Sequence, residues 1–404
     1  TRVWEKYYYD AFQILESPSQ KPTVSVVSSP QDPIETQAIT LKVSATDNTY
    51  LKKVVIYWND GSPHNQTWDN IYSSSYTPSQ NIGSYSAGKQ IEYWAVAWDT
   101  TGNQQESEHR TITIAPETIS TPNRPNGESY LQVGENSSYS TSGASSNLGN
   151  PVQYQFDWGD GQQSAWGTAT QQHAWSSGGS YFLKARARSQ INTSRVSDWS
   201  NTVQTTVDST PPTTIVQLDG TEGENGWYTS DVTVTLMPTD NLSGVIETKY
   251  KVNDGSWQKY SGPFSISGST VFYQSEDNAG NVEEQKSQEV KIDKTPPLIP
   301  VISDDGDTAP SKTQLHASWS TSDEKSGIAE YHYSVGTTPG GTDIVGWTST
   351  GTATEVTIKN LNLINGQTYY VGVKAKDGAG WWSAVGVSDG ITVDLPGITI
   401  EPTS

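Results

Sequence analysis

Short runs of alternating apolar and polar residues recur along the chain, separated by Gly, Pro, Asn and Asp. They include ITLKVSA at 39–45, VTVTLM at 232–237 and QLHASW at 314–319. Alternation places successive side chains on opposite faces, so that one face of each run packs into a core while the other meets solvent. Asp-Gly pairs at 60–61, 160–161 and 254–255 predict tight turns between such runs. The pattern predicts an all-β chain of antiparallel sandwiches.

Proline-rich segments divide these runs into groups. The segments are IAPETISTPNRP at 114–125, VDSTPP at 207–212 and IDKTPP at 292–297. Proline pairs stiffen a linker, and 404 residues suit about four domains of about 100 residues. We therefore expect four tandem Ig-like or fibronectin type III-like sandwiches forming an elongated rod, at 22–115, 116–207, 208–293 and 294–394. An N-terminal strand and linker at 1–21 precede them, and a tail at 395–404 follows.

The composition argues against several functions. A formal net charge of -20 disfavours nucleic-acid binding, and no run of about 18 apolar residues predicts a membrane span. The chain has no Cys, and its five His are scattered without metal-ligand spacing. No nucleophile elbow or phosphate-binding glycine loop is present, so we expect no enzyme activity.

Aspartates recur at corresponding places in three of the predicted domains. Second strands run into Asp47, Asp240 and Asp323, and penultimate strands end in Asp99, Asp277 and Asp377. Alternate residues of a strand share a face, so these carboxylates continue the inward-facing row to the rim of the sandwich. The linkers add Asp208 and Asp293, each shortly before a Pro pair.

Both kinds of strand end at the pole that the preceding linker reaches. We therefore expect two groups to converge: Asp208, Asp240 and Asp277, and Asp293, Asp323 and Asp377. Three carboxylates with backbone carbonyls suit Ca²⁺, and without a cation they would repel one another. The alternative is that each Asp caps a tight turn by accepting backbone N–H groups. The predicted domain 116–207 lacks the pattern, with Ser189 in place of the strand-end Asp and only Glu117 in its linker.

The two ends of the chain suggest a further calcium ligand set and a means of assembly. Asp47 and Asp99 have no linker acid before them, whereas Asp394 lies near the C-terminus, so that one chain would supply Asp394 to the next.

Residues 1–16 carry apolar side chains at both odd-numbered and even-numbered positions, as in a strand that is buried on both faces. Its main apolar residues are Trp4, Tyr7, Tyr8, Tyr9, Phe12 and Ile14. We expect this strand to insert into another copy, giving a head-to-tail polymer. The alternative is the last strand of an upstream domain in a longer protein.

The quoted motifs also resemble known modules. Residues 126–207, with the DWGDG turn, are similar to PKD-like domains; residues 211–293, with TDNLSGV and SEDNAGN, resemble a prokaryotic surface Ig-like repeat. Residues 297–394, with NGQTYYVGVKAKDGAG, resemble fibronectin type III domains, and 22–115 another Ig-like module. The resemblance implies an extracellular, cell-surface structural protein or filament subunit with adhesive relatives. A non-catalytic stalk of a larger secreted enzyme or adhesin is the alternative.

Two glycan-related expectations remain. Asn65, Asn136, Asn192 and Asn241 each begin an N-x-Ser/Thr sequon, which predicts glycosylation acceptors in an extracellular protein. Fifteen Trp residues offer rings that could stack on surface glycans as partners. Trp58, Trp158 and Trp319 lie on strands and are expected in cores, and Trp381 is expected to contact a domain junction rather than a sugar.

Overall fold

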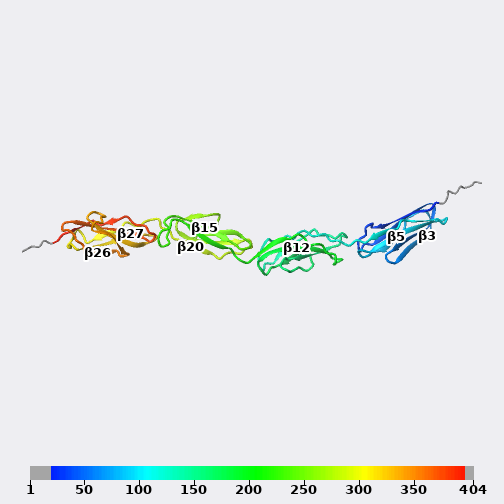
Figure 1. The fold of residues 1–404 in the computed structure, drawn as a ribbon, viewed down its shortest axis with the longest axis horizontal. Coiled ribbons are helices and arrows are strands. Elements are labelled where there is room, and N and C mark those ends of the chain that lie inside the picture. The colour runs from blue at the N-terminus through cyan, green and yellow to red at the C-terminus, as the bar shows by residue number, and fades with distance from the viewer. Residues whose placement is uncertain (1–19, 396–404) are drawn as a thin grey trace, which may run out of the picture. The chain divides into compact units, whose positions relative to one another are not determined.

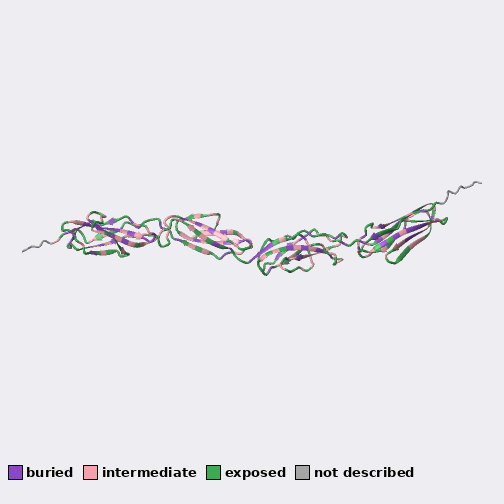
Figure 2. Ribbon diagram, in the orientation of Figure 1, coloured by how far each residue is buried: buried purple, intermediate pink, exposed green. Residues whose placement is uncertain are grey.

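A computed structural model describes residues 20–395 (Figure 1). Every regular element among these residues is a β-strand, and buried and exposed residues alternate along many of them (Figure 2). No helix that could cross a bilayer occurs in this part of the chain. The prediction of an all-β chain of tandem sandwiches is confirmed. The polymerisation strand predicted at 1–16 and the tail after Leu395 lie outside the described residues.

The described residues divide into two compact units. The first contains residues 20–128, 136–173 and 181–205, and the second contains 129–135, 174–180 and 206–395. The number and limits of the four predicted domains stay a prediction.

The first unit opens with a seven-stranded sheet. Its strands are β1 (Thr23–Ser29), β2 (Ile39–Asn59), β3 (Pro63–Tyr76), β4 (Ser79–Gly83), β5 (Gln90–Asp99), β6 (Gln104–Glu106) and β7 (Arg110–Thr113). β2 pairs with β1 and β4 through its first half and with β5 through its second half, while β3 pairs with the second half and also with Ala45 and Thr46. The two halves enclose a core that includes Leu41, Val54, Ile56 and Ile91.

The rest of the first unit contains two antiparallel pairs. β9 (Ser137–Ser140) pairs with β11 (Thr170–His173), and β10 (Val152–Asp157) pairs with β12 (Gly179–Ser189). Trp158 is buried, and its ring stacks on Phe156 and His173 at centroid distances of 5.0 and 4.8 Å. The predicted core position of Trp158 is therefore confirmed, and His173 packs against it and contacts Asp160 Oδ2 at 2.8 Å.

The second unit contains two sandwiches. Before them, β8 (Tyr130–Gln132) pairs in parallel with the last three residues of β13 (Val203–Asp208), and the first three residues of β13 belong to the first unit. One sandwich contains a three-stranded and a four-stranded sheet. The three-stranded sheet consists of β14 (Thr213–Asp219), β15 (Val232–Thr239) and β18 (Phe264–Ile266). The four-stranded sheet consists of β17 (Gln258–Lys259), β16 (Val245–Val252), β19 (Ser269–Asp277) and β20 (Lys286–Val290). Its core takes Val232, Val234 and Leu236 from the first sheet and Val271 and Tyr273 from the second.

The other sandwich has the same plan. Its smaller sheet contains β21 (Val301–Asp304), β23 (Gln314–Ser320) and β26 (Glu355–Lys359). Its larger sheet contains β22 (Thr308–Ala309), β29 (Ile391–Val393), β27 (Thr368–Asp377), β24 (Ile328–Gly336), β25 (Val345–Gly351) and β28 (Gly386–Val387). Trp319 from one sheet and Tyr369, Val371 and Val373 from the other form the core. Asp377 therefore ends a strand whose alternate residues are buried, as the sequence pattern predicts.

The close approach of β28 to the linker before β21 gives a test of this packing. A Cβ atom on Gly386 would lie 2.0 Å from the Pro300 carbonyl oxygen, whereas a Cβ on Gly346 would meet nothing within 4 Å. We expect Gly386→Ala to destabilise this sandwich by about 1–3 kcal/mol, because the backbone has to move. Gly346→Ala, the matched control, is expected to change stability by less than about 1 kcal/mol. Scanning calorimetry of the two variants measures the difference, and equal transitions would contradict this packing.

Candidate metal centre

Three strand ends bring Asp208, Asp240 and Asp277 together, and we call this group the first aspartate site. Asp208 is the last residue of β13, Asp240 directly follows β15, and Asp277 is the last residue of β19. One carboxylate oxygen from each residue lies within 4.8 Å of those of the other two. Asp208 and Asp277 are buried, and Asp240 is half-buried.

A second group, the second aspartate site, repeats this arrangement with Asp293, Asp323 and Asp377. Asp293 lies in the linker after β20, Asp323 follows β23, and Asp377 ends β27. Their carboxylate oxygens also lie within 4.8 Å of one another, with Asp293 and Asp377 buried. The structure thus groups the six linker and strand-end aspartates as the two predicted triplets.

Backbone N–H groups hold the carboxylates of the first aspartate site. Asp208 accepts the N–H of Thr210 at 2.9 Å and, on its other oxygen, the N–H of Ser243 at 2.9 Å. Asp240 Oδ2 accepts the N–H of Gly244 at 2.7 Å. Asp277 accepts the N–H and the side-chain amide of Asn281, both at 2.8 Å. The loops therefore orient the carboxylates without neutralising them.

The second aspartate site has the same kind of support. Asp293 Oδ2 accepts the Ser326 hydroxyl at 2.6 Å and the Ser326 N–H at 3.2 Å. Asp323 Oδ1 accepts the N–H groups of Ser326 and Gly327 at 2.8 and 2.9 Å. Asp377 Oδ1 accepts the N–H of Trp381 at 2.8 Å, and the indole N–H of Trp381 donates to the Asp293 carbonyl at 3.2 Å. Trp381 therefore contacts two of the three aspartates of this site, and its expected place at a domain junction stays a prediction.

Some buried oxygens at these sites have no hydrogen-bond donor. In the first site they are Asp240 Oδ1 and the Ser243 hydroxyl, and in the second site Asp377 Oδ2. Among the described residues, no Lys, Arg or His forms an ion pair with any of the six aspartates. A buried carboxylate oxygen without a partner is energetically unfavourable, so the geometry fits a bound cation.

The pKa values of three of these carboxyls are shifted. Burial raises the pKa of Asp377, an effect that the N–H groups of Trp381 and Gly380 oppose and the nearby charge of Asp293 reinforces. Burial also acts to raise the pKa of Asp208, but hydrogen bonds from Thr210 and Ser243 outweigh it and hold the pKa below its usual value. Burial likewise opposes the lowered pKa of Asp293, where hydrogen bonds from Ser326 and Thr295 prevail. The linker acids are thus held ionised, and the site as a whole accumulates negative charge.

Three predicted ligands do not join either group. Asp99 is buried and accepts the N–H groups of Thr101 and Asn103, each at 2.8 Å, as a turn-capping residue does. Asp47 lies inside the continuous strand β2 and accepts the N–H of Thr49 at 2.7 Å. Asp394 is exposed, and its N–H donates to Ala309. The contacts of Asp99 agree with the alternative prediction, in which each Asp caps a tight turn by accepting backbone N–H groups.

Sequence reasoning missed two serines that complete the sites. Ser243 and Ser326 each lie three residues after the loop aspartate of their site and donate to the linker acid. The D-x-x-S spacing at 240–243 and 323–326 was the available signal. Of the four sequon asparagines, Asn65, Asn136 and Asn241 are exposed and Asn192 is half-buried, which leaves glycosylation a prediction.

Comparisons with known proteins concern the fold alone. No protein-family model and no curated protein matches the chain. Among solved structures, it is similar to the PKD domain of an M14-like peptidase from Thermoplasmatales archaeon SCGC AB-540-F20, with 23% identity over 22% of this chain and 96% of that chain and a TM-score of 0.20. It is similar to a tetra-tandem repeat in the extending region of a large adhesion protein, with 15% identity, 91% and 99% coverage and a TM-score of 0.31. It is also similar to a bacterial ice-binding adhesin, with 12% identity, 69% and 99% coverage and a TM-score of 0.35. These are PKD and adhesin repeat structures, as the resemblance of the sequence implies.

The raised pKa of Asp377 predicts an unusual pH dependence in metal-free protein. Because the folded-state pKa exceeds the unfolded value of about 3.9, the ionised side chain destabilises the fold at neutral pH, and this penalty disappears as pH falls through the folded-state pKa. In chelator at pH 7, Asp377→Asn is therefore expected to melt at a higher temperature than the wild type, and the gap should narrow as pH falls toward 5. Calorimetry at several pH values tests this. A variant that melts lower than the wild type in chelator at pH 7 would show that the buried charge is already compensated.

Proposed function

We propose that the chain is a structural, non-catalytic repeat region of an extracellular surface protein, stiffened by calcium at the two aspartate sites. The main support is the observation of which segments supply the three aspartates of each triplet. One aspartate belongs to the segment that leads into a sandwich, and the other two belong to that sandwich: Asp208 precedes β14, and Asp293 precedes β21. A cation bound by all three would tie the leading segment to the sandwich and restrict its bending.

The donor set favours Ca²⁺ over other metals. All candidate ligands are oxygens, and neither site contains the His or Cys ligands that structural zinc requires. Calcium takes about six to eight oxygen ligands in flexible geometry, which suits carboxylates supplied by separate loops. Asp208, Asp240 and Asp277 would hold one ion, and Asp293, Asp323 and Asp377 a second.

We further propose that copies of the chain assemble head to tail into a filament. Residues 1–16 would be donated as a strand to another copy, and Asp394 of one chain would approach Asp47 and Asp99 of the next. The support is the two-sided apolar pattern of TRVWEKYYYDAFQILE, typical of a strand buried on both faces. A non-catalytic stalk of a larger secreted enzyme or adhesin, which holds another domain away from a surface, is the second candidate. Its support is the adhesive and enzyme-associated modules that the sequence resembles.

Calcium is expected to raise the melting temperature through both sites. At about one hundred times its Kd, one bound ion stabilises the fold by about 2.7 kcal/mol. Asp240→Ala and Asp323→Ala should each remove the calcium-dependent shift of one calorimetric transition, because each deletes a ligand. Asp254→Ala, which removes an exposed acid outside both sites, serves as the matched control. An identical shift in all four proteins, or no shift in the wild type, would exclude the calcium sites.

Deletion of residues 1–16 tests the assembly separately. In calcium, negative-stain microscopy of the full chain should show filaments, and the deletion variant should show single particles with unchanged circular dichroism. Because a lost strand removes its backbone hydrogen bonds as well as its apolar contacts, the loss of filaments should be complete. Single particles in both samples would favour the stalk.

A further inference from the structure

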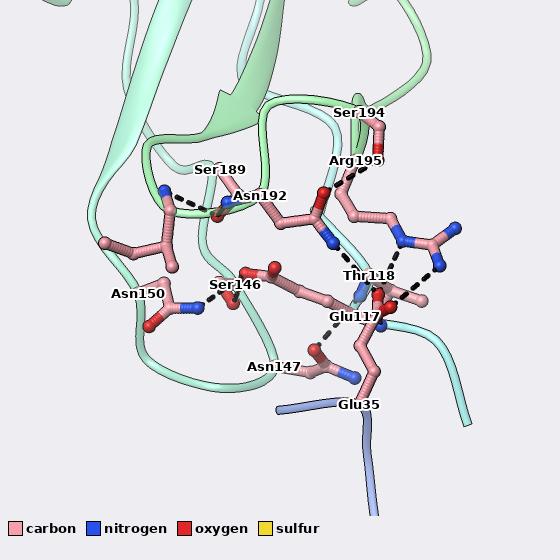
Figure 3. Close-up of polar contacts among 11 residues, drawn as sticks. Glu35, Glu117, Thr118, Ser146, Asn147, Asn150, Ser189, Asn192, Ser194 and Arg195 are labelled. Atoms are coloured by element: carbon pink, nitrogen blue, oxygen red, sulfur yellow. Dashed lines mark hydrogen bonds and ion pairs between the residues drawn. The ribbon is translucent and has the colours of Figure 1, made fainter. Parts of the chain in front are cut away.

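The Glu117 segment resembles the aspartate sites in one contact. Glu117 Oε1 accepts the hydroxyl of Ser146 at 2.6 Å (Figure 3). Asp293 likewise accepts the hydroxyl of Ser326 at 2.6 Å, whereas Asp208 accepts the backbone N–H of Ser243 at 2.9 Å. Three leading segments therefore each place a buried acid against a serine of a following loop. We call Glu35, Glu117, Ser146, Asn192 and Arg195 the Glu117 joint; all five lie in the first unit.

The two receiving aspartates are missing from this joint. The residue three before Ser146 is Gly143, where the aspartate sites have Asp240 and Asp323. Strand β12 ends at the fully buried Ser189, where β19 and β27 end in Asp277 and Asp377. Two of the three carboxylates that would hold a divalent cation are therefore absent.

The loop after β12 is longer and carries a cation. The N–H of Ser189 donates to the carbonyl of Arg195, six residues later. In the aspartate sites the corresponding bonds, from Asp277 to Asn281 and from Asp377 to Trp381, close after four residues. The two additional residues allow the loop to present the Arg195 guanidinium.

Arg195 forms a two-pronged ion pair with Glu35. Its Nε lies 2.6 Å from Glu35 Oε1 and its Nη2 lies 3.1 Å from Oε2, a geometry in which guanidinium and carboxylate match (Figure 3). Glu35 Oε1 also accepts the N–H of Glu117 at 2.9 Å and the side-chain amide of Asn192 at 3.3 Å. The hydrogen bond from Arg195 is the main reason that the pKa of Glu35 is lowered despite burial. Glu35 thereby connects the segment after β1, the Glu117 segment and the loop after β12.

The charges of the joint balance differently from those of the aspartate sites. The joint contains two buried carboxylates and one guanidinium: Arg195 pairs with Glu35, whereas Glu117 Oε2 has no hydrogen-bond donor and its carboxylate acts on Arg195 only through its charge. In each aspartate site, three carboxylates face no cationic side chain among the described residues. We propose that Arg195 is the built-in cation of the Glu117 joint, so that this joint closes without metal while the aspartate sites depend on calcium. The contrast with the aspartate sites rests on the proposed function.

The test compares Arg195→Gln with calcium removal in the full chain. Hydrogen exchange, followed by mass spectrometry with fragmentation, reports on the amide of Glu117, which donates to Glu35, and on the amide of Asn192, which donates to Ser189 at 3.1 Å. In Arg195→Gln, exchange at Glu117 should accelerate at least about tenfold with and without calcium, because the partner carboxylate loses its cation. In the wild type, chelator should change exchange at Glu117 and Asn192 by less than about twofold.

Two further variants serve as a control and as an independent test. Arg124→Gln removes the same charge from an exposed position and should leave both amides unchanged. Glu35→Gln keeps the side-chain volume and should accelerate exchange at Glu117 as Arg195→Gln does. Unchanged exchange at Glu117 in both Arg195→Gln and Glu35→Gln, or acceleration in the wild type by chelator, would overturn the assignment of Arg195.

The same spectra separate this inference from the calcium proposal. The amides of Ser243 and Asn281 donate to Asp208 and Asp277, so calcium binding at the first aspartate site should slow their exchange. If chelator leaves these two amides unchanged, the calcium proposal fails at that site. The response of Glu117 to Arg195→Gln still decides the role of Arg195.

Discussion

A buried carboxylate requires compensation, and this requirement shapes the strand ends of the second unit. Asp208, Asp277, Asp293 and Asp377 are each at most 1% exposed. Their neighbouring loops supply N–H donors, which orient the carboxylates and hold the linker acids ionised, but bring no positive side chain. The remaining negative charge makes each triplet a group that could hold a metal ion. Two local features bring the aspartates of each triplet together. They are the tight turns after the strands and the linkers that carry an acid before a Pro pair.

Under the proposed function, two kinds of cation would compensate these buried acids, Arg195 at the Glu117 joint and a bound ion at each aspartate site. A guanidinium belongs to the chain and acts at every calcium concentration, whereas a bound divalent ion contributes only as far as its concentration exceeds its Kd. Replacing a metal by Arg195 needs fewer carboxylates, which agrees with Gly143 and Ser189 at the places of the receiving aspartates. It also needs a longer loop, because the side chain has to reach its partner from the backbone. The absence of the two receiving acids and the presence of a cation thus occur together in this joint.

Several aromatic rings of the described residues contact other side chains of the chain. Tyr57 stacks on Trp94 at 5.2 Å, and Trp94 stacks on His109 at 4.3 Å. Arg186 lies over the rings of Trp166 and Trp199, and Lys374 lies over those of Trp347 and Trp382. A sugar would have to displace these partners to stack on the covered ring faces. These Trp rings therefore contribute to packing on the outer sheet faces.

Sequence reasoning reached the aspartate triplets because their placement follows from the period of a β-strand. Asp377 continues the inward row of Tyr369, Val371 and Val373, so its position at the rim could be read from parity alone. The same parity places Asp99 at a strand end, but Thr101 and Asn103 satisfy its carboxylate locally, and no alternation rule distinguishes the two outcomes.

The ion pair of Glu35 and Arg195 could not be found in this way. The two residues are 160 positions apart and neither lies in a strand, so no periodicity relates them. Glu117 was visible as the acid of its linker, but its partner Ser146 lies in a loop without a repeated motif. Strand periodicity therefore predicts where a chain accumulates charge at strand ends, whereas the identity of the compensating cation depends on loop lengths and tertiary contacts that only the folded structure reveals.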